Sequence, residues 1–341
     1  MRILIPFVLS ALLPGLAAAQ GKAGPCDRAC LERFVDQYMD AMAAHNPGQL
    51  FAKNVKFTEN GVRLQLGEGL WSSMVGKGTY KFYVPDIETQ QVGFIGTARE
   101  EGAAPGGDPV AVALRLKIAN GRISEAEQLV LRGDAGWQNP VGASLEKRGK
   151  PDPAFGGAIP ATQQPSRQEM IKTANYYFSG IQQNDGKGYY PFADDCDRIE
   201  NGEQATNVPL KPGEKRPDPK TSILYSSAWG CREQFESGLI HFVTRVRDRR
   251  FVAVDRERGV VYSFAFFDHA AGKTRTFKVP DGRTVTSGPT APWTWQIAEL
   301  FKVEKGKIRK IEALLMRCPY GMNSGWSSYE QGMSDQPQII Q

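Results

Sequence analysis

Apolar residues recur at the spacing of a helix in two stretches that lie far apart in the chain. In residues 31–44 the apolar side chains fall three and four positions apart, and residues 168–181 repeat this spacing. Each stretch carries a tyrosine on its apolar face, Tyr38 in the first and Tyr177 in the second. The pattern predicts two amphipathic helices, each burying one face.

Sequence blocks that follow the two helices also match in pairs. Residues 51–61 read FAKNVKFTENG and residues 192–202 read FADDCDRIENG. Farther on, NGRISEAEQLVLR at 120–132 corresponds to KGKIRKIEALLMR at 305–317. Three matched features in the same order indicate two copies of one domain, each on the order of 130–170 residues.

Strand patterns fill the rest of each copy. Residues 110–118 form one predicted strand in the first copy, and 259–267 and 293–303 form two in the second. Turn signals at 120–121 and 305–306 precede the last strand of each copy. A helix followed by a run of antiparallel strands predicts an α+β fold.

The predicted organisation has five parts. Residues 142–167 are rich in Gly, Pro, Ala and Gln without apolar periodicity, so we place the domain boundary near residue 160. Residues 208–221, rich in proline and basic residues, read as a solvated loop inserted in the second copy. The parts are a signal peptide (1–20), a first domain (21–150), a linker (151–167), a second domain (168–327) and a polar tail (328–341), which we expect to be ordered only in part.

The N-terminus has the features of a secretory signal. Arg2 precedes an apolar run at 3–16, and alanines at 17–19 offer the small residues that signal peptidase accepts. The run is shorter than the roughly 20 residues that span a bilayer. We therefore expect a periplasmic or secreted protein without a stable membrane anchor, the alternative being an N-terminal anchor.

Export changes the interpretation of the five cysteines. In an oxidising compartment cysteines pair by default, and an odd number leaves one over. Cys26 and Cys30 lie one helical turn apart, and Cys196 and Cys231 bracket the proline-rich loop, so both pairs are candidates, although other pairings stay open. Cys318 as a nucleophile is the less favoured alternative, because no histidine is placed beside it by the sequence.

Composition narrows the function classes. With 41% hydrophobic and 23% charged residues the chain is typical of a folded protein. A net charge of +5 from 42 basic and 37 acidic residues argues against nucleic acid as a partner. Three histidines, with no Gly-rich phosphate loop or metal motif, predict neither a metal site nor a nucleotide cofactor. The alternating charges of 245–258 we interpret as a solvated face.

These features resemble the nuclear-transport-factor-2-like superfamily, which includes ketosteroid isomerase, scytalone dehydratase and the SnoaL-like cyclases. FADDCDRIENG and the preceding Tyr177 carry this resemblance. The second copy also resembles a tandem-domain family of secreted, mostly uncharacterised proteins, through CDRIENG (196–202), RDRRFVAVDRERG (247–259), FFDH (266–269) and PYGMNSGW (319–326). The resemblance implies two tandem cone-shaped α+β domains, each a curved antiparallel sheet closed by N-terminal helices around an apolar pocket.

The resemblance also suggests catalytic residues. An acid in the first strand acts as the base in isomerase-like members, which points to Glu200, and a helix tyrosine such as Tyr177 can donate to an oxyanion. The competing interpretations are a turn residue and a core tyrosine. Asp268 could hold His269 in one tautomer, the alternative being a loop histidine bonded to backbone. The first copy lacks this pair, so we expect the working pocket in the second.

Substrate contacts come from the ends of the later strands. Arg317 could pair with Glu200 or Asp197, or bind a carboxylate. The predicted substrate-binding residues are Arg198, Trp295, Arg317, Tyr320 and Trp326, for each of which core packing or a structural ion pair is the alternative.

Three functions are consistent with these patterns. The first is a cofactor-independent lyase or isomerase acting on a small hydrophobic, aromatic or terpenoid molecule. The second is a periplasmic binding protein for such a molecule, without chemistry. The third is a protein with filled domains that works through its surface. A second copy of the chain is a further candidate partner.

Overall fold

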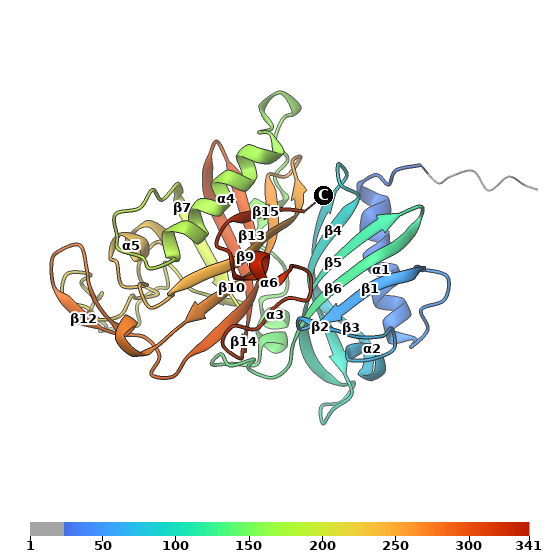
Figure 1. Cartoon of the computed structure of the whole chain (residues 1–341), viewed down its shortest axis with the longest axis horizontal. Helices are drawn as coiled ribbons and strands as arrows, with labels where there is room; N and C mark the ends of the chain where they lie inside the picture. The colour runs from blue at the N-terminus through green and yellow to red at the C-terminus, as the bar shows by residue number, and fades with distance from the viewer. Residues whose placement is uncertain (1–23, 341) are drawn as a thin grey trace, which may run out of the picture.

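The structure, a computed structural model, describes residues 24–340 and contains two large sheets, one in each half of the chain (Figure 1). The first sheet has the strand order β2-β1-β6-β5-β4-β3. Its strands are β1 (Phe51–Glu59), β2 (Val62–Arg63), β3 (Met74–Asp86), β4 (Gln91–Glu100), β5 (Asp108–Ala119) and β6 (Arg122–Leu131).

The second sheet repeats this order as β8-β7-β14-β13-β10-β9, with β15 added at the β9 edge. In both sheets the first strand pairs in parallel with the last of the copy, β1 with β6 and β7 with β14, and the inner pairs are antiparallel. The mixed α+β class and a repeated architecture are therefore present. The strands are β7 (Phe192–Glu200), β8 (Glu203–Gln204), β9 (Arg245–Asp255), β10 (Val260–His269), β13 (Trp293–Glu304), β14 (Lys307–Cys318) and β15 (Pro337–Ile339).

One long helix packs on each sheet. Helix α1 (Arg28–Ala43) begins at Asp27, whose carboxylate accepts from the Cys30 amide, and α4 (Arg167–Ile181) begins with a capping box of Ser166 and Glu169. Their apolar faces join the cores of the first and second sheet respectively. The two helices predicted from periodicity are confirmed within a few residues at each end.

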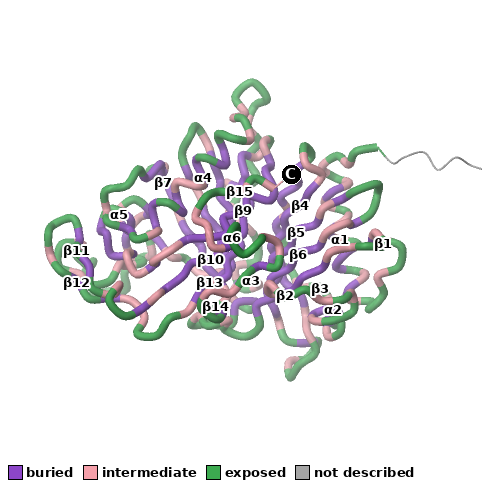
Figure 2. The backbone as a smooth tube through the Cα atoms, viewed as in Figure 1, coloured by how far each residue is buried: buried purple, intermediate pink, exposed green. Residues whose placement is uncertain are grey.

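A third core lies between the two sheets. Tyr80 and Ile95 of the first sheet and Tyr262 and Leu300 of the second belong to one buried cluster, so the sheets pack face to face in the middle of the molecule (Figure 2). Two further members come from the segment between the halves, Leu145 of helix α3 (Val141–Arg148) and Phe155. The segment 142–167, whose sequence shows no apolar periodicity, therefore does more than connect the halves, because its few apolar side chains help to fill the space between the sheets.

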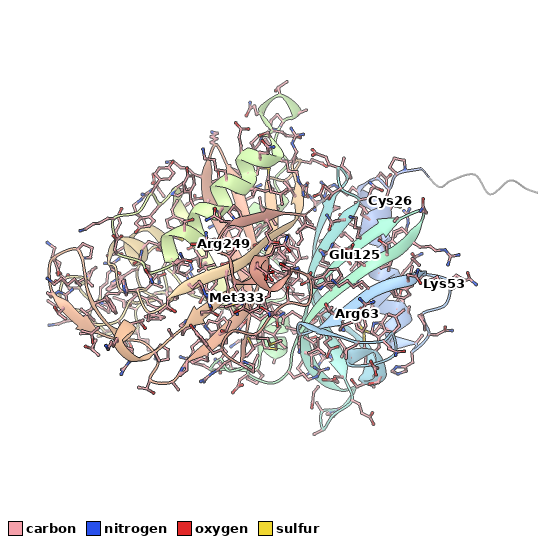
Figure 3. The ribbon with its side chains drawn as sticks, in the orientation of Figure 1. Cys26, Lys53, Arg63, Glu125, Arg249 and Met333 are labelled. Carbon is pink, nitrogen blue, oxygen red and sulfur yellow. A yellow bond between two sulfur atoms is a disulfide. The ribbon has the colours of Figure 1, made fainter. Side chains whose placement is uncertain are left out.

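The solvated interpretation of residues 245–258 is also wrong, because they form β9 and its turn, and both faces of this strand are covered. Arg249 points to α4, where it donates to Ser179 Oγ at 3.1 Å (Figure 3). The next residue, Arg250, makes two hydrogen bonds to Glu127 of the first sheet, at 2.8 and 2.7 Å. Consecutive arginines on this strand therefore make side-chain hydrogen bonds on opposite faces of the sheet.

Smaller elements complete the chain. The segment after Ser327, expected to be ordered only in part, forms α6 (Tyr329–Met333) and β15, which pairs in parallel with β9. The remaining elements are α2 (Leu70–Ser73), α5 (Cys231–Glu236) and a hairpin of β11 (Thr276–Lys278) and β12 (Thr284–Thr286).

Two disulfides join Cys26 to Cys30 and Cys196 to Cys231, and Cys318 is free and buried. Both expected pairings are confirmed, and disulfides of this kind are typical of exported proteins. The expected signal peptide lies outside the described residues. Among residues 24–340, no helix has the length and apolar character needed to cross a bilayer.

Candidate functional site

A cavity lies in the second half, between α4 and the second sheet. The centres of water molecules can occupy about 50 Å³ of this cavity, so it has room for a few waters. Its rim consists of four half-buried aromatic residues, Trp137, Tyr225, Phe242 and Trp295. Its walls are buried and apolar, except for five side chains that carry polar groups: Tyr177, Arg198, Glu200, His269 and Glu299.

Arg198 and Glu200 form an ion pair at the bottom of this cavity. They lie two residues apart on β7, so both side chains point to the same face, and Arg198 Nη2 donates to Glu200 Oε1. Arg198 Nη1 donates to Gln234 Oε1 of α5 at 2.6 Å. Each is less than a tenth exposed, so the pair is held in low dielectric, where it is strongly oriented.

Glu299 on β13 is the residue that the sequence analysis missed. It is 2% exposed, and its Oε2 atom has no hydrogen-bond partner. Burial raises the pKa of this carboxyl to about 8, an effect that the nearby Arg198 opposes and the Glu200 carboxylate reinforces. The Tyr177 hydroxyl is hydrogen-bonded to Glu299, and burial raises the pKa of Tyr177 well above its ordinary value. At neutral pH the site therefore holds a protonated carboxylic acid beside a phenol.

His269 lies at the end of β10 in the same cavity. Burial lowers the pKa of its imidazole to about 4, so the ring is neutral at pH 7. It stacks on Trp293, with ring centroids 3.9 Å apart, and its Nδ1 atom has no partner. A neutral imidazole with a free nitrogen can accept or donate a proton.

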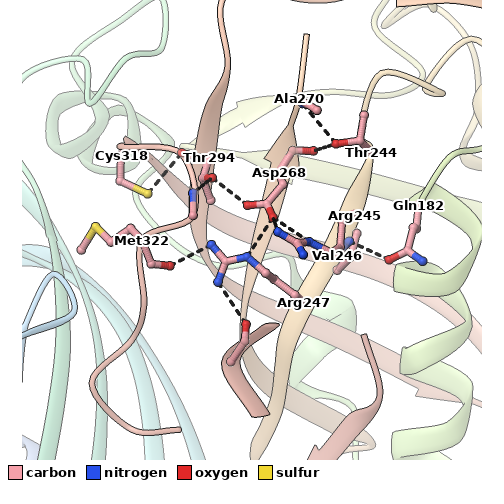
Figure 4. Close-up of polar contacts among 12 residues, drawn as sticks. Gln182, Thr244, Arg245, Val246, Arg247, Asp268, Ala270, Thr294, Cys318 and Met322 are labelled. Atoms are coloured by element: carbon pink, nitrogen blue, oxygen red, sulfur yellow. Dashed lines mark hydrogen bonds and ion pairs between the residues drawn. The ribbon is translucent and has the colours of Figure 1, made fainter. Parts of the chain in front are cut away.

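Asp268 does not orient His269. Neighbouring residues on a strand point to opposite faces, and Asp268 accepts hydrogen bonds from Arg245, Arg247 and Thr294 on the other side of β10 (Figure 4). Its distance to Arg247 Nε is 2.8 Å, and the carboxylate is fully buried. The structure therefore gives Asp268 an ion-pairing position outside the cavity.

The remaining predicted substrate contacts divide between the rim and the surface. Trp295 lies on the rim. The Arg317 guanidinium lies over the Trp293 ring, 4.9 Å from its centroid, rather than on Glu200 or Asp197. Tyr320 is 45% exposed, and Trp326 donates to Thr58 Oγ1 of the first half at 2.8 Å. Tyr320, Arg317 and Trp326 are not among the residues that line this cavity.

The corresponding place in the first half is closed by its own side chains. Tyr38 donates to Gln128 Oε1 at 2.8 Å and accepts from Trp71 Nε1 at 3.0 Å. Gln128 Nε2 in turn donates to Glu59 Oε2 at 2.8 Å. The strand pairings match Gln128 of this network with Ala313 of the second half. They also match two apolar positions on strands of the first sheet with charged residues of the cavity, Phe57 with Arg198 and Leu114 with Glu299.

The second half also has a longer connection after β8. In the first half the segment between β2 and β3 is short and delivers Trp71. In the second half residues 205–244 form an insertion that includes the proline-rich loop and α5, and it supplies Tyr225, Ile240, Phe242 and Val243 to the cavity. The Cys196–Cys231 disulfide ties this insertion to β7.

Within residues 24–340, no group of three or more His, Cys, Asp or Glu side chains is arranged to hold a metal ion. What the cavity offers chemically is a protonated acid, a phenol, an arginine–glutamate pair and a neutral imidazole.

Fold and cavity together define an α+β protein of two packed sheets with a polar-floored cavity in its second half. Residues 163–315, which contain most of that half, match a family described as a domain of unknown function (DUF8021). No curated protein matches the chain. A de novo designed protein with a curved β-sheet aligns with 44% of this chain and 88% of its own length, at 16% identity and a TM-score of 0.24, which is too low to support an argument.

Proposed function

We propose that each half is a cone-shaped domain of the nuclear-transport-factor-2-like kind, and that the second cone is a site of proton transfer. The repeated strand order and the helix packed on each sheet support the fold. The function proposed is that of an exported, cofactor-independent lyase or isomerase acting on a small, neutral, largely hydrophobic molecule.

The observation that carries this proposal is the position of Glu299, a buried carboxyl that lines the cavity and has one oxygen without a hydrogen-bond partner. A carboxyl whose pKa is about 8 is protonated at neutral pH. Because this pKa lies near the ambient pH, the carboxyl can exchange its proton readily. The Tyr177 hydroxyl donates to this carboxyl, and the carboxyl's own proton, on the oxygen without a partner, can be donated to a carbonyl oxygen that gains negative charge. Donors of this kind stabilise an enolate more than the neutral ketone from which it forms.

The proton removed from carbon needs a second group. Glu200 is one candidate base, and its ion pair with Arg198 keeps it oriented toward the cavity. The neutral His269 imidazole is the other. Because acid and base come from different strands, a substrate between them can lose a proton on one side and gain one on the other.

The alternative function is a binding protein for a hydrophobic molecule. A carrier needs the aromatic rim, but it gains nothing from a buried acid whose burial costs stability. The polar floor therefore favours the enzyme. The cavity volume favours substrates smaller than a terpenoid unless side chains on the rim move.

Exchange of carbon-bound protons tests the proposal without knowledge of the natural substrate. Cyclopentanone, cyclopent-2-enone and acetylacetone are incubated with the protein in D₂O at neutral pD, and loss of the α-proton signals is followed by ¹H NMR. We expect exchange above the buffer rate for at least one of these compounds. Glu299→Gln, Glu200→Gln and His269→Ala should identify which groups transfer the proton.

The outcomes separate the candidate functions. Exchange that falls at least tenfold in Glu299→Gln supports the enzyme. Exchange no faster than in buffer for all three compounds, with binding detected by ligand-observed NMR, supports the carrier and refutes proton transfer. Neither exchange nor binding favours a protein that works through its surface.

A further inference from the structure

One of the four aromatic residues on the cavity rim comes from the other half of the chain. Trp137 lies in the loop between β6, the last strand of the first sheet, and α3. The other three belong to the second half, Tyr225 and Phe242 to the insertion and Trp295 to β13. The loop of residues 132–140 lies outside the segment that matches the domain family.

Contacts from the loop to the second half hold Trp137 over the rim. Its indole packs against Trp295, with ring centroids 5.8 Å apart at 56°. The indole Nε1 donates to Glu203 Oε2 of β8 at 3.3 Å, and Asn139 Nδ2 donates to the other oxygen of the same carboxylate. Two loop side chains therefore share one anchor in the second half.

The backbone of the loop is shaped to make this contact. Gly136 has φ +85°, and a Cβ at this position would lie 2.6 Å from Arg317 Cβ. The Ala135 carbonyl accepts from the Arg317 amide at 2.9 Å. Most residues of the loop are exposed, whereas Ala135 and Trp137 are half-buried against the second half. A loop with few buried contacts can open at lower cost than a strand or helix.

Aromatic rings in contact with one another connect Trp295 of the rim to His269. Trp295 contacts Trp293 at 4.6 Å between centroids, and Trp293 stacks on His269 at 3.9 Å. Trp137 packs against Trp295 at the end of this series opposite His269, and it is the member that the first half supplies.

We propose that Trp137 is the gate of the cavity, so that the first half supplies a residue that controls access to a site in the second half. The proposal rests on the proposed function only in taking this cavity as the binding site. It assigns the first half a role beyond packing, since removing the indole should open the site without altering its floor.

Labelling of a cysteine inside the cavity tests the gate without a substrate. Val243 lines the cavity, is 3% exposed and is close to cysteine in size. In a Val243→Cys protein, iodoacetamide labelling of that thiol is followed by mass spectrometry of the peptide. The same rate is measured with Trp137→Ala, with Trp137→Phe, and with Gln138→Ala, an exposed residue of the same loop, as the matched control.

We expect labelling at least tenfold faster with Trp137→Ala, a rate within threefold of the parent with Trp137→Phe, and no change with Gln138→Ala. Unchanged thermal unfolding of each variant and an unlabelled Cys318 show that the core stays closed. Equal labelling rates with and without the indole overturn the proposal. Proton exchange at small ketones is a separate measurement, so its absence would refute the proposed enzyme while leaving the gate intact.

Discussion

Replacing Glu299 by glutamine should stabilise the protein, and the gain should grow with pH. Glutamine has nearly the same shape as glutamate but cannot ionise, so the substitution removes the free-energy cost of burying an ionisable group. The carboxyl has an ordinary pKa of 4.5 in the unfolded chain and a pKa of about 8 when folded. A raised pKa means that the contribution of this group is most favourable below pH 4.5 and is lost as the pH rises toward 8.

The magnitude follows from that difference. Folding must return a proton to the carboxyl, which costs about 1 kcal/mol at pH 5 and about 3 kcal/mol at pH 7. The Glu299→Gln protein avoids this cost, so its advantage over the wild type should increase by about 2 kcal/mol between these pH values. Glu312, whose pKa burial raises to about 7, is present in both proteins, so its contribution cancels in the comparison.

Urea unfolding at pH 5 and pH 7, with the disulfides intact, measures both proteins. Glu304→Gln, at the half-exposed end of the same strand, controls for removal of one carboxylate from β13. An advantage that is the same at both pH values would refute the buried, protonated state of Glu299. If the stability advantage of the Glu299→Gln protein over the wild type were smaller at pH 7 than at pH 5, the pKa of Glu299 would be lowered by folding and not raised.

Three further perturbations test other parts of the structure by urea unfolding. Arg198→Met leaves the buried Glu200 carboxylate without its cation and should cost about 3–5 kcal/mol at pH 7; a loss below 1 kcal/mol would mean that the ion pair is solvated. Replacing Cys196 and Cys231 together by serine should cost about 2–4 kcal/mol, and an unchanged midpoint would show that the insertion is held without the bond. Glu127→Ala removes both hydrogen bonds from the buried Arg250 to the first sheet, leaves Asp248 as its remaining ion-pair partner, and should also cost about 3–5 kcal/mol. A neutral result there would contradict close packing of the two halves.

The helical spacing of apolar residues and the repeated sequence blocks predicted much of the fold, because both can be recognised in short stretches of sequence. The two helices follow from apolar spacing, and the turns after β1 and β7 follow from Asn-Gly pairs whose backbone has positive φ. The packing of the two sheets against each other was not predicted, since it is a long-range property. Arg250 shows why: alternating charge normally marks a solvated face, and only the position of Glu127 on the other sheet makes it a buried strand.

The candidate site was predicted only in part for the same reason. Glu200 and Tyr177 were predicted through the family resemblance, and His269 from its place beside Asp268 at the end of a predicted strand. All three line one cavity. Glu299 was missed although it carried a signal, a single acid within the apolar run of β13. Trp137 carried none, because a tryptophan in a polar loop gives no indication of which surface it covers.

The two halves show what separates a filled domain from one with a site. In the first, a glutamine side chain joins Tyr38 to Glu59, and Trp71 completes the network, so its polar groups are used internally. In the second, Ala313 stands where that glutamine would be and leaves space beside Glu299, whose unpartnered oxygen costs stability. Buried polar groups without partners lower stability, and proteins typically keep them at functional sites, where a ligand can supply the missing partner. Here the corresponding groups of the first half are paired, so that half does not lose this stability. The first half can then stabilise the chain through the shared core between the sheets, while the second half keeps the buried polar groups of the cavity.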